Sequence, residues 1–351
     1  MISAAYFSTM WKAFISLVFP LMLLACGADS KKQLSLRLGE GETKFTLGQS
    51  TKVRLVAPEG FSPDSVHYIM DGKTLEVNAG TVVLQAGRGG NHKLTAQVFS
   101  DGEATPVELK IQLLAPNPPE IFTYEILNTY PHDIEAFTQG LEFKGDTLYE
   151  STGQRGHSSL RKVDYKSGKV LTKTDLEPKY FGEGLTLLDD SLYMLTWQSN
   201  TGFIYDPASL ERKSSFSYGQ SKEGWGLCND GQRIYKSDGS ERIWILNPKT
   251  MTEEGYIETV TNKSVFNKAN ELEYVDGKIY ANVWQKPSMM IIDAETGIIE
   301  GVVNFSGLRD KVTQHPELDV FNGVAYHAER QTFFVTGKKW DRLFEVKIVR
   351  K

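Results

Sequence analysis

Cysteine, concentrated basic charge and paired histidines are scarce in this chain, and each scarcity excludes a class of protein. The 351 residues contain two cysteines, Cys26 and Cys228, so no disulfide framework is expected. No run of lysine and arginine occurs and the net charge is −5, which argues against a nucleic-acid partner because phosphate binding needs a concentrated basic surface. The six histidines show no HxH or HExxH spacing, so we expect no catalytic metal.

Long apolar runs are also scarce, and the one at residues 13–25, AFISLVFPLMLLA, is too short for a confident membrane-spanning helix. It fits the hydrophobic part of a signal peptide. The sequence LLACG around Cys26 resembles the bacterial lipobox, whose cysteine becomes the lipidated N-terminus. A plain secretory signal with an incidental cysteine is the alternative. We therefore expect residues 1–26 to be a lipoprotein signal peptide, 27–32 a tether, and the protein to be lipid-anchored in the bacterial cell envelope.

Residues 33–114 consist of short alternating runs, such as LSLRL, KVRLVAP and HKLTAQVFSDG. Turn residues separate them at intervals of roughly 8–12 residues, which is typical of an antiparallel sandwich. This pattern predicts an immunoglobulin-like β-sandwich without a disulfide, acting as a spacer or adhesion module. The segment APNPPE at 115–120 has three prolines, which fix φ and remove hydrogen-bond donors, so it predicts a stiff linker.

A pattern that begins with FTQGLEFKGDTLYESTG at residues 137–153 returns four more times. Each copy has one alternating run, a polar turn and a second run with an aromatic residue. A period in the forties with several short strands per copy is the signature of propeller blades, so five copies predict an all-β, five-bladed propeller at 121–351. The aligned positions are Leu148, Leu192, Ile234, Ile279 and Phe333, in steps of 44, 42, 45 and 54 residues.

The ends of this repeat region predict how the ring closes. The run IFTYEILNTY precedes the first copy, and the fifth copy has only three strands of its own. We expect the opening run to complete the fifth blade and remove an exposed edge. The longer final step contains an insertion, SGLRDKVTQHPELD, which could fold as a short helix.

Topology also predicts where a site lies. In an antiparallel blade, the start of the innermost strand and the end of the second strand lie at the same end of the ring, so these positions share one mouth of the central channel. Tryptophans, amides, carboxylates and a lysine there predict a concave, partly apolar pocket. These positions are Phe137, Thr138, Gln139, Gly153, Phe181, Glu183, Trp197, Glu223, Trp225, Gly239, Asn270, Glu271, Trp284, Asn322 and Lys338, with Glu150 three residues before Gly153.

The blocks PHDIEAFTQGLEF, YFGEGLTLL, NELEYVDGKIYANVWQ and VTGKKWDRLFEVKI resemble the glutaminyl-peptide cyclotransferases of plant and bacterial type, over about residues 124–348. The resemblance implies a five-bladed propeller that converts N-terminal Gln of peptides or proteins to pyroglutamate and releases ammonia. It implies an aminoacyltransferase that needs no cofactor. The apolar N-terminal run and the 33–114 module lie outside the resemblance.

In this reaction a carboxylate takes a proton from the attacking amine and passes it to the leaving nitrogen, while donors stabilise the oxyanion. Glu150, in LYESTG, corresponds to the glutamate associated with catalysis in the family and is our first candidate. Glu183, in FGEGL, is the second, and it could instead bind the substrate α-ammonium. The candidates for substrate binding are Gln139, Asn270, Asn282, Asn322 and Lys338 as polar partners, and Phe137, Trp197, Trp225 and Trp284 as the pocket wall.

Two other functions stay open at this point. A non-enzymatic envelope propeller that binds a partner would be expected to lack the key glutamates, which are present here. A metal-dependent propeller hydrolase such as a lactonase would need three or four carboxylate or Asn ligands, and Glu183, Asn270 and Asn322 form only a weak set. A structural cation in the channel also stays open.

Overall fold

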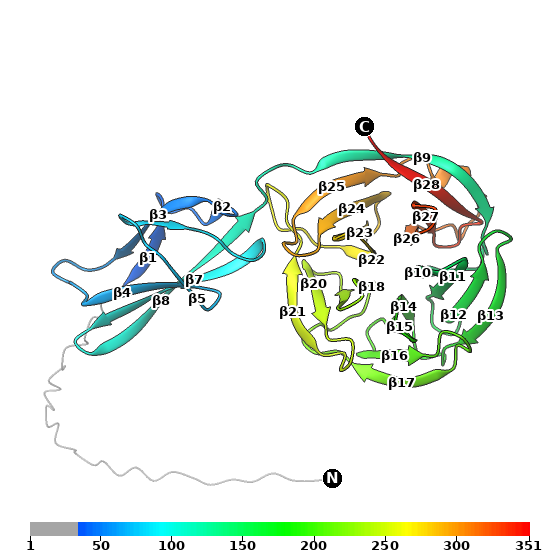
Figure 1. The fold of residues 1–351 in the computed structure, drawn as a ribbon, viewed down its shortest axis with the longest axis horizontal. Helices are drawn as coiled ribbons and strands as arrows, with labels where there is room; N and C mark the ends of the chain where they lie inside the picture. The colour runs from blue at the N-terminus through cyan, green and yellow to red at the C-terminus, as the bar shows by residue number, and fades with distance from the viewer. Residues whose placement is uncertain (1–33) are drawn as a thin grey trace, which may run out of the picture.

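The computed structural model describes residues 34–351, and strands make up nearly all of its regular structure, which confirms the all-β prediction (Figure 1). The predicted signal peptide, Cys26 and the tether lie outside the described residues. Within residues 34–351, no helix is long and apolar enough to cross a membrane.

Residues 34–114 form two sheets that enclose one hydrophobic core. Side chains alternate between the two faces of a strand, so the period-two runs of the sequence bury one face and expose the other. In β7, for example, Leu94, Ala96 and Val98 are buried. The first sheet has the order β1 (Ser35–Leu38), β3 (Ser50–Val56), β6 (Thr81–Val83), and the second has β2 (Lys44–Thr46), β8 (Glu103–Leu114), β7 (Gly90–Ser100), β4 (Ser65–Met70), β5 (Lys73–Leu75).

The remaining strands form sheets around a common centre (Figure 1). Three sheets have four strands in sequence order. They are β10 (Thr138–Lys144), β11 (Thr147–Thr152), β12 (Ser159–Asp164), β13 (Lys169–Asp175); β14 (Gly182–Leu188), β15 (Ser191–Thr196), β16 (Thr201–Tyr205), β17 (Arg212–Ser217); and β18 (Leu227–Asn229), β19 (Ile234–Ser237), β20 (Arg242–Leu246), β21 (Glu253–Glu258).

The fourth sheet of this region has eight strands. Its order is β22 (Ala269–Val275), β23 (Lys278–Val283), β24 (Ser288–Asp293), β25 (Ile299–Asn304), β9 (Glu120–Pro131), β28 (Arg342–Arg350), β27 (Thr332–Gly337), β26 (Phe321–His327). The strands β10, β14, β18, β22 and β26 contact one another in turn, and β26 contacts β10 again. These five strands therefore form a closed circle around the centre.

The opening strand β9 lies between β25 and β28. It pairs antiparallel with β28, as the sequence predicts, and parallel with β25. The carboxylate of Glu345 on β28 accepts hydrogen bonds from Asn128 Nδ2 at 2.8 Å, Tyr130 Oη at 3.0 Å and Thr332 Oγ1 at 2.8 Å, and it pairs with Arg330 at 2.7 Å. One buried carboxylate thus joins segments 217 positions apart.

The centre of the circle is also held by a carboxylate. Glu271 on β22 accepts the backbone N–H of Leu141 on β10 at 3.2 Å and that of Val324 on β26 at 2.8 Å. Burial raises the pKa of Glu271 well above the usual carboxyl range. One side chain therefore connects three of the five inner strands.

The insertion before β26 is mostly irregular. The short helix considered from the sequence is a three-residue 3₁₀ turn, Arg309–Lys311. The segment is held by packing, because Leu308, Val312 and Leu318 join a buried cluster with Trp340. Pro316 and this irregular spacing of buried residues do not suit a longer helix.

A junction joins residues 34–114 to the ring. The Glu258 carboxylate on β21 accepts a hydrogen bond from the backbone N–H of Asn91, and it lies 3.4 Å from Arg88 Nη1. Gly90 has φ +106°, and a Cβ there would lie 2.1 Å from Glu258 Oε2. Only glycine fits this close approach of the two parts.

Candidate functional site

Five half-buried aromatic side chains line the predicted mouth of the channel. Phe137 meets Phe181 edge-on with ring centroids 6.0 Å apart, and Phe181 meets Trp197 at 5.5 Å. Trp225 and Trp284 form a second group at 5.7 Å. The structure thus brings together all four wall residues predicted from the sequence, and it adds Phe181.

Glu223 connects the two aromatic groups. Its Oε2 accepts hydrogen bonds from the indole Nε1 of both Trp197 and Trp225, each at 2.9 Å, and its Oε1 accepts one from Gln198 Nε2 at 3.1 Å. Burial acts to raise the pKa of Glu223, but these hydrogen bonds outweigh it and hold the pKa below the usual value. The ionised carboxylate therefore fixes the orientation of two indole rings.

The ends of the second strands share a backbone conformation that shapes this rim. Gln154, Gln198, Gln285 and Lys339, each just past such a strand, have φ values of 77°, 54°, 60° and 61°, and Gly239 has φ 80°. Left-handed backbone at a non-glycine residue costs about 1 kcal/mol or more and is concentrated at functional sites. A Cβ on Gly239 would lie 2.4 Å from the Trp225 ring, so glycine also makes room for the wall.

Glu183 lies at the start of β14 and is 5 % exposed. Among residues 34–351, no group donates a hydrogen bond to its carboxylate. Burial raises its pKa well above the usual range, the charge of Lys338 opposes that rise, and the charge of Glu223 adds to it. This carboxyl group therefore combines a small exposed surface with an environment that favours its protonated form.

Lys338 ends β27 and is 6 % exposed, and its Nζ lies 4.7 Å from the centroid of the Phe137 ring. In the part of the chain that the structure describes, its ammonium donates no hydrogen bond to a protein group. Burial lowers its pKa, and the charges of Glu183 and Asp319 oppose that shift. Like Glu183, Lys338 is thus a polar side chain of the mouth that has no hydrogen-bond partner among the described residues.

Three predicted amides form a chain. Asn270 Nδ2 donates to Asn322 Oδ1 at 2.8 Å, and Asn322 Nδ2 donates to the Thr138 carbonyl at 2.9 Å and to Gln139 Oε1 at 3.3 Å. Gln139 and Asn270 retain 3 % and 4 % exposure, whereas Asn322 is fully buried. The chain leaves the side-chain oxygen Oδ1 of Asn270 and the side-chain nitrogen Nε2 of Gln139 free to meet a ligand.

Glu150, the first catalytic candidate, lies in a closed network. It accepts hydrogen bonds from Thr138 Oγ1 at 2.8 Å and His132 Nε2 at 3.0 Å, and Arg161 lies 3.8 Å away. Burial acts to raise the pKa of Glu150, but the charges of His132 and Arg161 outweigh it, so the pKa is lowered. His132 also donates from Nδ1 to the Trp340 carbonyl at 2.7 Å. The side chain of Glu150 is therefore paired and almost wholly buried.

Asn282, another predicted ligand contact, is fully buried. Its Oδ1 accepts the backbone N–H of Gly323 at 2.8 Å, and its Nδ2 has no partner. Phe181 and Glu223 are two residues of the aromatic wall that sequence reasoning placed at the mouth without assigning them a role. Their positions in the repeat could have identified them, because both lie at the starts of inner strands.

Residues 34–351 contain no group of three or more His, Cys, Asp or Glu side chains that could hold a metal ion.

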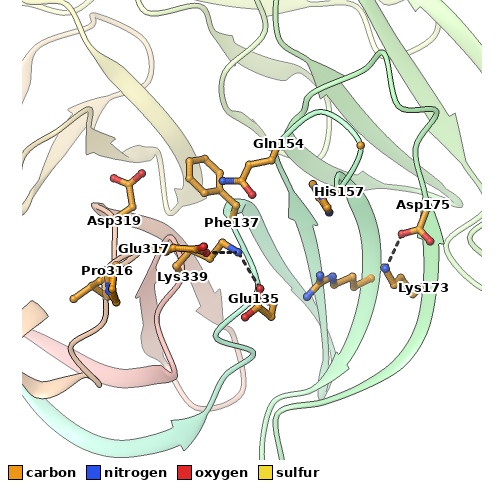
Figure 2. Close-up of a pocket in the computed structure, with 13 residues that line it drawn as sticks. Glu135, Phe137, Gln154, His157, Lys173, Asp175, Pro316, Glu317, Asp319 and Lys339 are labelled. Carbon is orange, nitrogen blue, oxygen red and sulfur yellow. Dashed lines mark hydrogen bonds and ion pairs between the residues drawn. The ribbon is translucent and has the colours of Figure 1, made fainter.

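A cleft of about 810 Å³ adjoins the aromatic wall (Figure 2). Phe137 lines it, and so belongs to both the wall and the cleft. The loop after β11 and the strands β12 and β13 form one side, and the insertion and Lys339 form the other. The lining residues are Glu135, Phe137, Gln154, Gly156, His157, Arg161, Lys173, Asp175, Pro316, Glu317, Leu318, Asp319 and Lys339.

Comparisons with known proteins agree on one family. The family model for glutamine cyclotransferases matches residues 93–348, a range that contains every residue of the mouth. A curated glutaminyl-peptide cyclotransferase of Arabidopsis thaliana is 40% identical over 228 residues, which are 64% of this chain and 71% of that protein. The crystal structure of Myxococcus xanthus glutaminyl cyclase matches with a TM-score of 0.62 and 33% identity, over 66% of this chain and 99% of that chain.

Proposed function

Because this chain belongs to the glutamine cyclotransferase family, we propose that it converts the N-terminal Gln of peptides and proteins to pyroglutamate and releases ammonia. The observation that carries the proposal is the mouth itself. A buried carboxyl group without a hydrogen-bond partner, Glu183, shares an aromatic-walled site with the unpaired Lys338 and two amides that have free polar atoms.

The proposed reaction needs a group that first accepts and then donates one proton. The substrate α-amine attacks the side-chain carbonyl carbon, and Glu183 takes a proton from that amine as the carbon–nitrogen bond forms. Glu183 then gives the proton to the departing nitrogen, the second carbon–nitrogen bond breaks, and ammonia leaves. Because burial raises the pKa of Glu183, its carboxylate is a stronger base for the first step than an exposed glutamate would be.

The free polar atoms of the site fit the other needs of this reaction. The side-chain oxygen Oδ1 of Asn270 can accept a hydrogen bond from the substrate amine, and Gln139 Nε2 or the Lys338 ammonium can donate to the oxyanion. The aromatic wall holds the Gln side chain folded against its own amine, and proximity is a large part of catalysis in an intramolecular ring closure.

The contacts favour Glu183 over Glu150 as the proton shuttle. Glu150 is ionised and its oxygens are held by Thr138, His132 and Arg161. We assign it a positioning role, because Thr138 begins β10 beside Phe137 and His132 holds the Trp340 backbone. Asn282 and Asn322 are likewise assigned to positioning rather than to ligand contact.

We also propose a five-bladed propeller preceded by an immunoglobulin-like module. The closed circle of five inner strands supports five blades, and the eight-stranded sheet divides into two blades that share an edge between β25 and β9. Two sheets around one core support the module in residues 34–114.

The lipid anchor is a separate proposal that rests on the sequence around Cys26. It places the enzyme on a membrane of the bacterial cell envelope. Cells grown with an alkyne-labelled fatty acid should label the wild-type protein and not the Cys26→Ser variant. Equal labelling of both would overturn the anchor.

Ammonia release from a Gln-initiated dipeptide amide tests the activity and the shuttle together. We expect turnover by the full chain to survive a strong chelator. Glu183→Gln should lower kcat by about 1000-fold, since general acid–base catalysis contributes on that order. Glu150→Gln should retain kcat within about tenfold if the circular dichroism spectrum is unchanged.

The reverse outcome for the two glutamates would assign the shuttle to Glu150. Loss of activity in the chelator would indicate a metal site. No turnover by the folded wild-type chain would instead favour a protein that binds N-terminal Gln without cyclising it.

A further inference from the structure

The cleft beside the aromatic wall is continuous with the proposed active site. Phe137 packs at a right angle to Phe181 in the wall, has the Lys338 ammonium over its ring, and lines the cleft as well. In a substrate whose Gln side chain occupies the mouth, the following residues must leave past this rim. We propose that the cleft binds the peptide segment that follows the N-terminal Gln, and that its inner end favours a cationic side chain. The inference rests on the proposed function.

The length of the cleft suits an extended peptide. It runs from Phe137, next to β10, out to Lys173 and Asp175 on β13, which is the outermost strand of that sheet. Three interstrand spacings amount to about 14 Å, and an extended chain of about four residues covers that distance. The cleft therefore has room for several residues beyond the cyclised Gln.

Charge at the inner end of the cleft is negative. Lys339 is nearly buried there and pairs with both Glu135 at 3.1 Å and Glu317 at 3.4 Å (Figure 2). Asp319 adds a third carboxylate, and no described cation lies within ion-pair distance of it. Lys339, together with Lys338 on which the charge of Asp319 acts, thus faces three carboxylates, and two of these, Glu135 and Glu317, are largely exposed and able to meet a peptide cation.

The outer end is neutral by comparison. Lys173 pairs with Asp175 at 2.7 Å, and farther in, on β12, the buried Arg161 is held by Asp133 at 2.8 Å. The polar groups left for the peptide backbone are the Gln154 amide and the His157 imidazole, whose side chains make no hydrogen bond within residues 34–351. The cleft therefore offers backbone partners along its length and charge selection near the mouth.

Two substrate series test this proposal. In the first, Gln-initiated peptide amides grow from two to six residues, and we expect KM to fall with length and to level off at about five residues. In the second, pentapeptide amides carry Lys, Gln or Glu at positions two and three. We expect kcat/KM to be about fivefold higher for Lys than for Glu, as partly exposed charge pairs allow.

A double variant, Glu135→Gln with Glu317→Gln, should abolish or reverse the preference for Lys and leave dipeptide-amide turnover unchanged. The matched control is Glu120→Gln with Glu300→Gln, which removes two partly exposed, ion-paired carboxylates elsewhere on the ring. That control should keep the preference, so a change of net charge alone cannot explain the result.

The outcomes separate this inference from the function beneath it. No turnover of the dipeptide amide would overturn the proposed function. If dipeptide turnover is normal but KM does not depend on peptide length, only the proposed peptide cleft is overturned. The same holds if the double variant and the wild type show the same charge preference.

Discussion

At the scale of single residues, the state of one carboxyl group decides whether the proposed chemistry can run. Burial raises the pKa of Glu183, and the positive charge of Lys338 opposes that rise. Because Lys338 is itself buried, its own pKa is lowered. The charge of each side chain therefore shifts the pKa of the other.

Replacing Lys338 by Met should raise the pKa of Glu183 further, because the charge that stabilises its ionised form is removed. The carboxyl stretch in infrared difference spectra follows this titration, with Glu183→Gln as the blank. Lys268→Met is the matched control, since Lys268 lies over Trp284 at the same rim. An unchanged titration in Lys338→Met would show that the two charges do not interact.

At the scale of strands, one carboxylate secures the joint between β9 and β28. Hydrogen bonds from Arg330, Asn128, Thr332 and Tyr130 overcome the effect of burial and lower the pKa of Glu345 to about 2. A lowered pKa means that the folded state binds this proton less tightly than the unfolded state. The stabilisation is therefore complete above the ordinary value of 4.5 and is lost as pH falls from there towards 2.

Glu345→Gln should lower the free energy of unfolding at pH 7 by about 2 kcal/mol, in line with the loss of charged hydrogen bonds. The difference from wild type should shrink as pH falls from 4.5 towards 2. Urea unfolding at pH 7 and pH 3 measures both effects. Glu300→Gln, which removes an exposed pair with Lys278, should cost less than about 1 kcal/mol. A difference that does not change with pH would contradict this account.

The strands and the mouth were accessible to sequence reasoning because both follow from short-range patterns. Period-two alternation marks strands, and a repeat in the forties places equivalent strand ends together. From the repeat alone, this reasoning assigns Phe137, Trp197, Trp225 and Trp284 to one rim. It also paired the opening run with the strand that ends the fifth copy.

The choice between Glu150 and Glu183 was not accessible in the same way. Both lie on strands near the mouth, so the repeat pattern alone does not distinguish which of the two carboxyl groups transfers the proton. Glu150 is paired by His132 from the loop before β10, and His132 is held by Trp340, which is 208 positions away. The cleft also depends on residues far apart in the sequence, because it forms between the sheet of β10–β13 and the insertion before β26. Contacts of this range are set by the closed ring, not by local sequence.

At the scale of the whole molecule, the junction fixes how residues 34–114 meet the ring. Gly90 lies against the Glu258 side chain, and the Asn91 N–H bonds that carboxylate. Nearby, the Gly89 N–H bonds the Thr296 carbonyl at 2.8 Å, and the Ala115 N–H bonds that of Thr261 at 3.1 Å. The junction therefore includes hydrogen bonds from the backbone N–H groups of Gly89, Asn91 and Ala115 to the ring.

Gly90→Ala should separate the two parts while leaving turnover intact, because every residue of the mouth lies within 121–351. The added Cβ must displace Glu258, at a cost of about 1–3 kcal/mol for overpacking. Limited proteolysis of the segment 115–119 should become faster. Gly102→Ala is the control, since Gly102 also has positive φ but open space around it. Equal proteolysis of Gly90→Ala and wild type would show that the junction does not hold the two parts together.

The joint between β9 and β28 also has a consequence in time. A ribosome adds about 5–20 residues per second, so the 217 positions between Asn128 and Glu345 take ~10–40 s to synthesise. During that interval β9 has emerged and its partner β28 has not, and the growing ring is an open arc with unpaired edges. Such edges are the surfaces from which chains aggregate. Slow elongation late in the coding sequence therefore lengthens the period in which a nascent chain is exposed to its neighbours, although β9 and β28 are paired with each other in the finished ring.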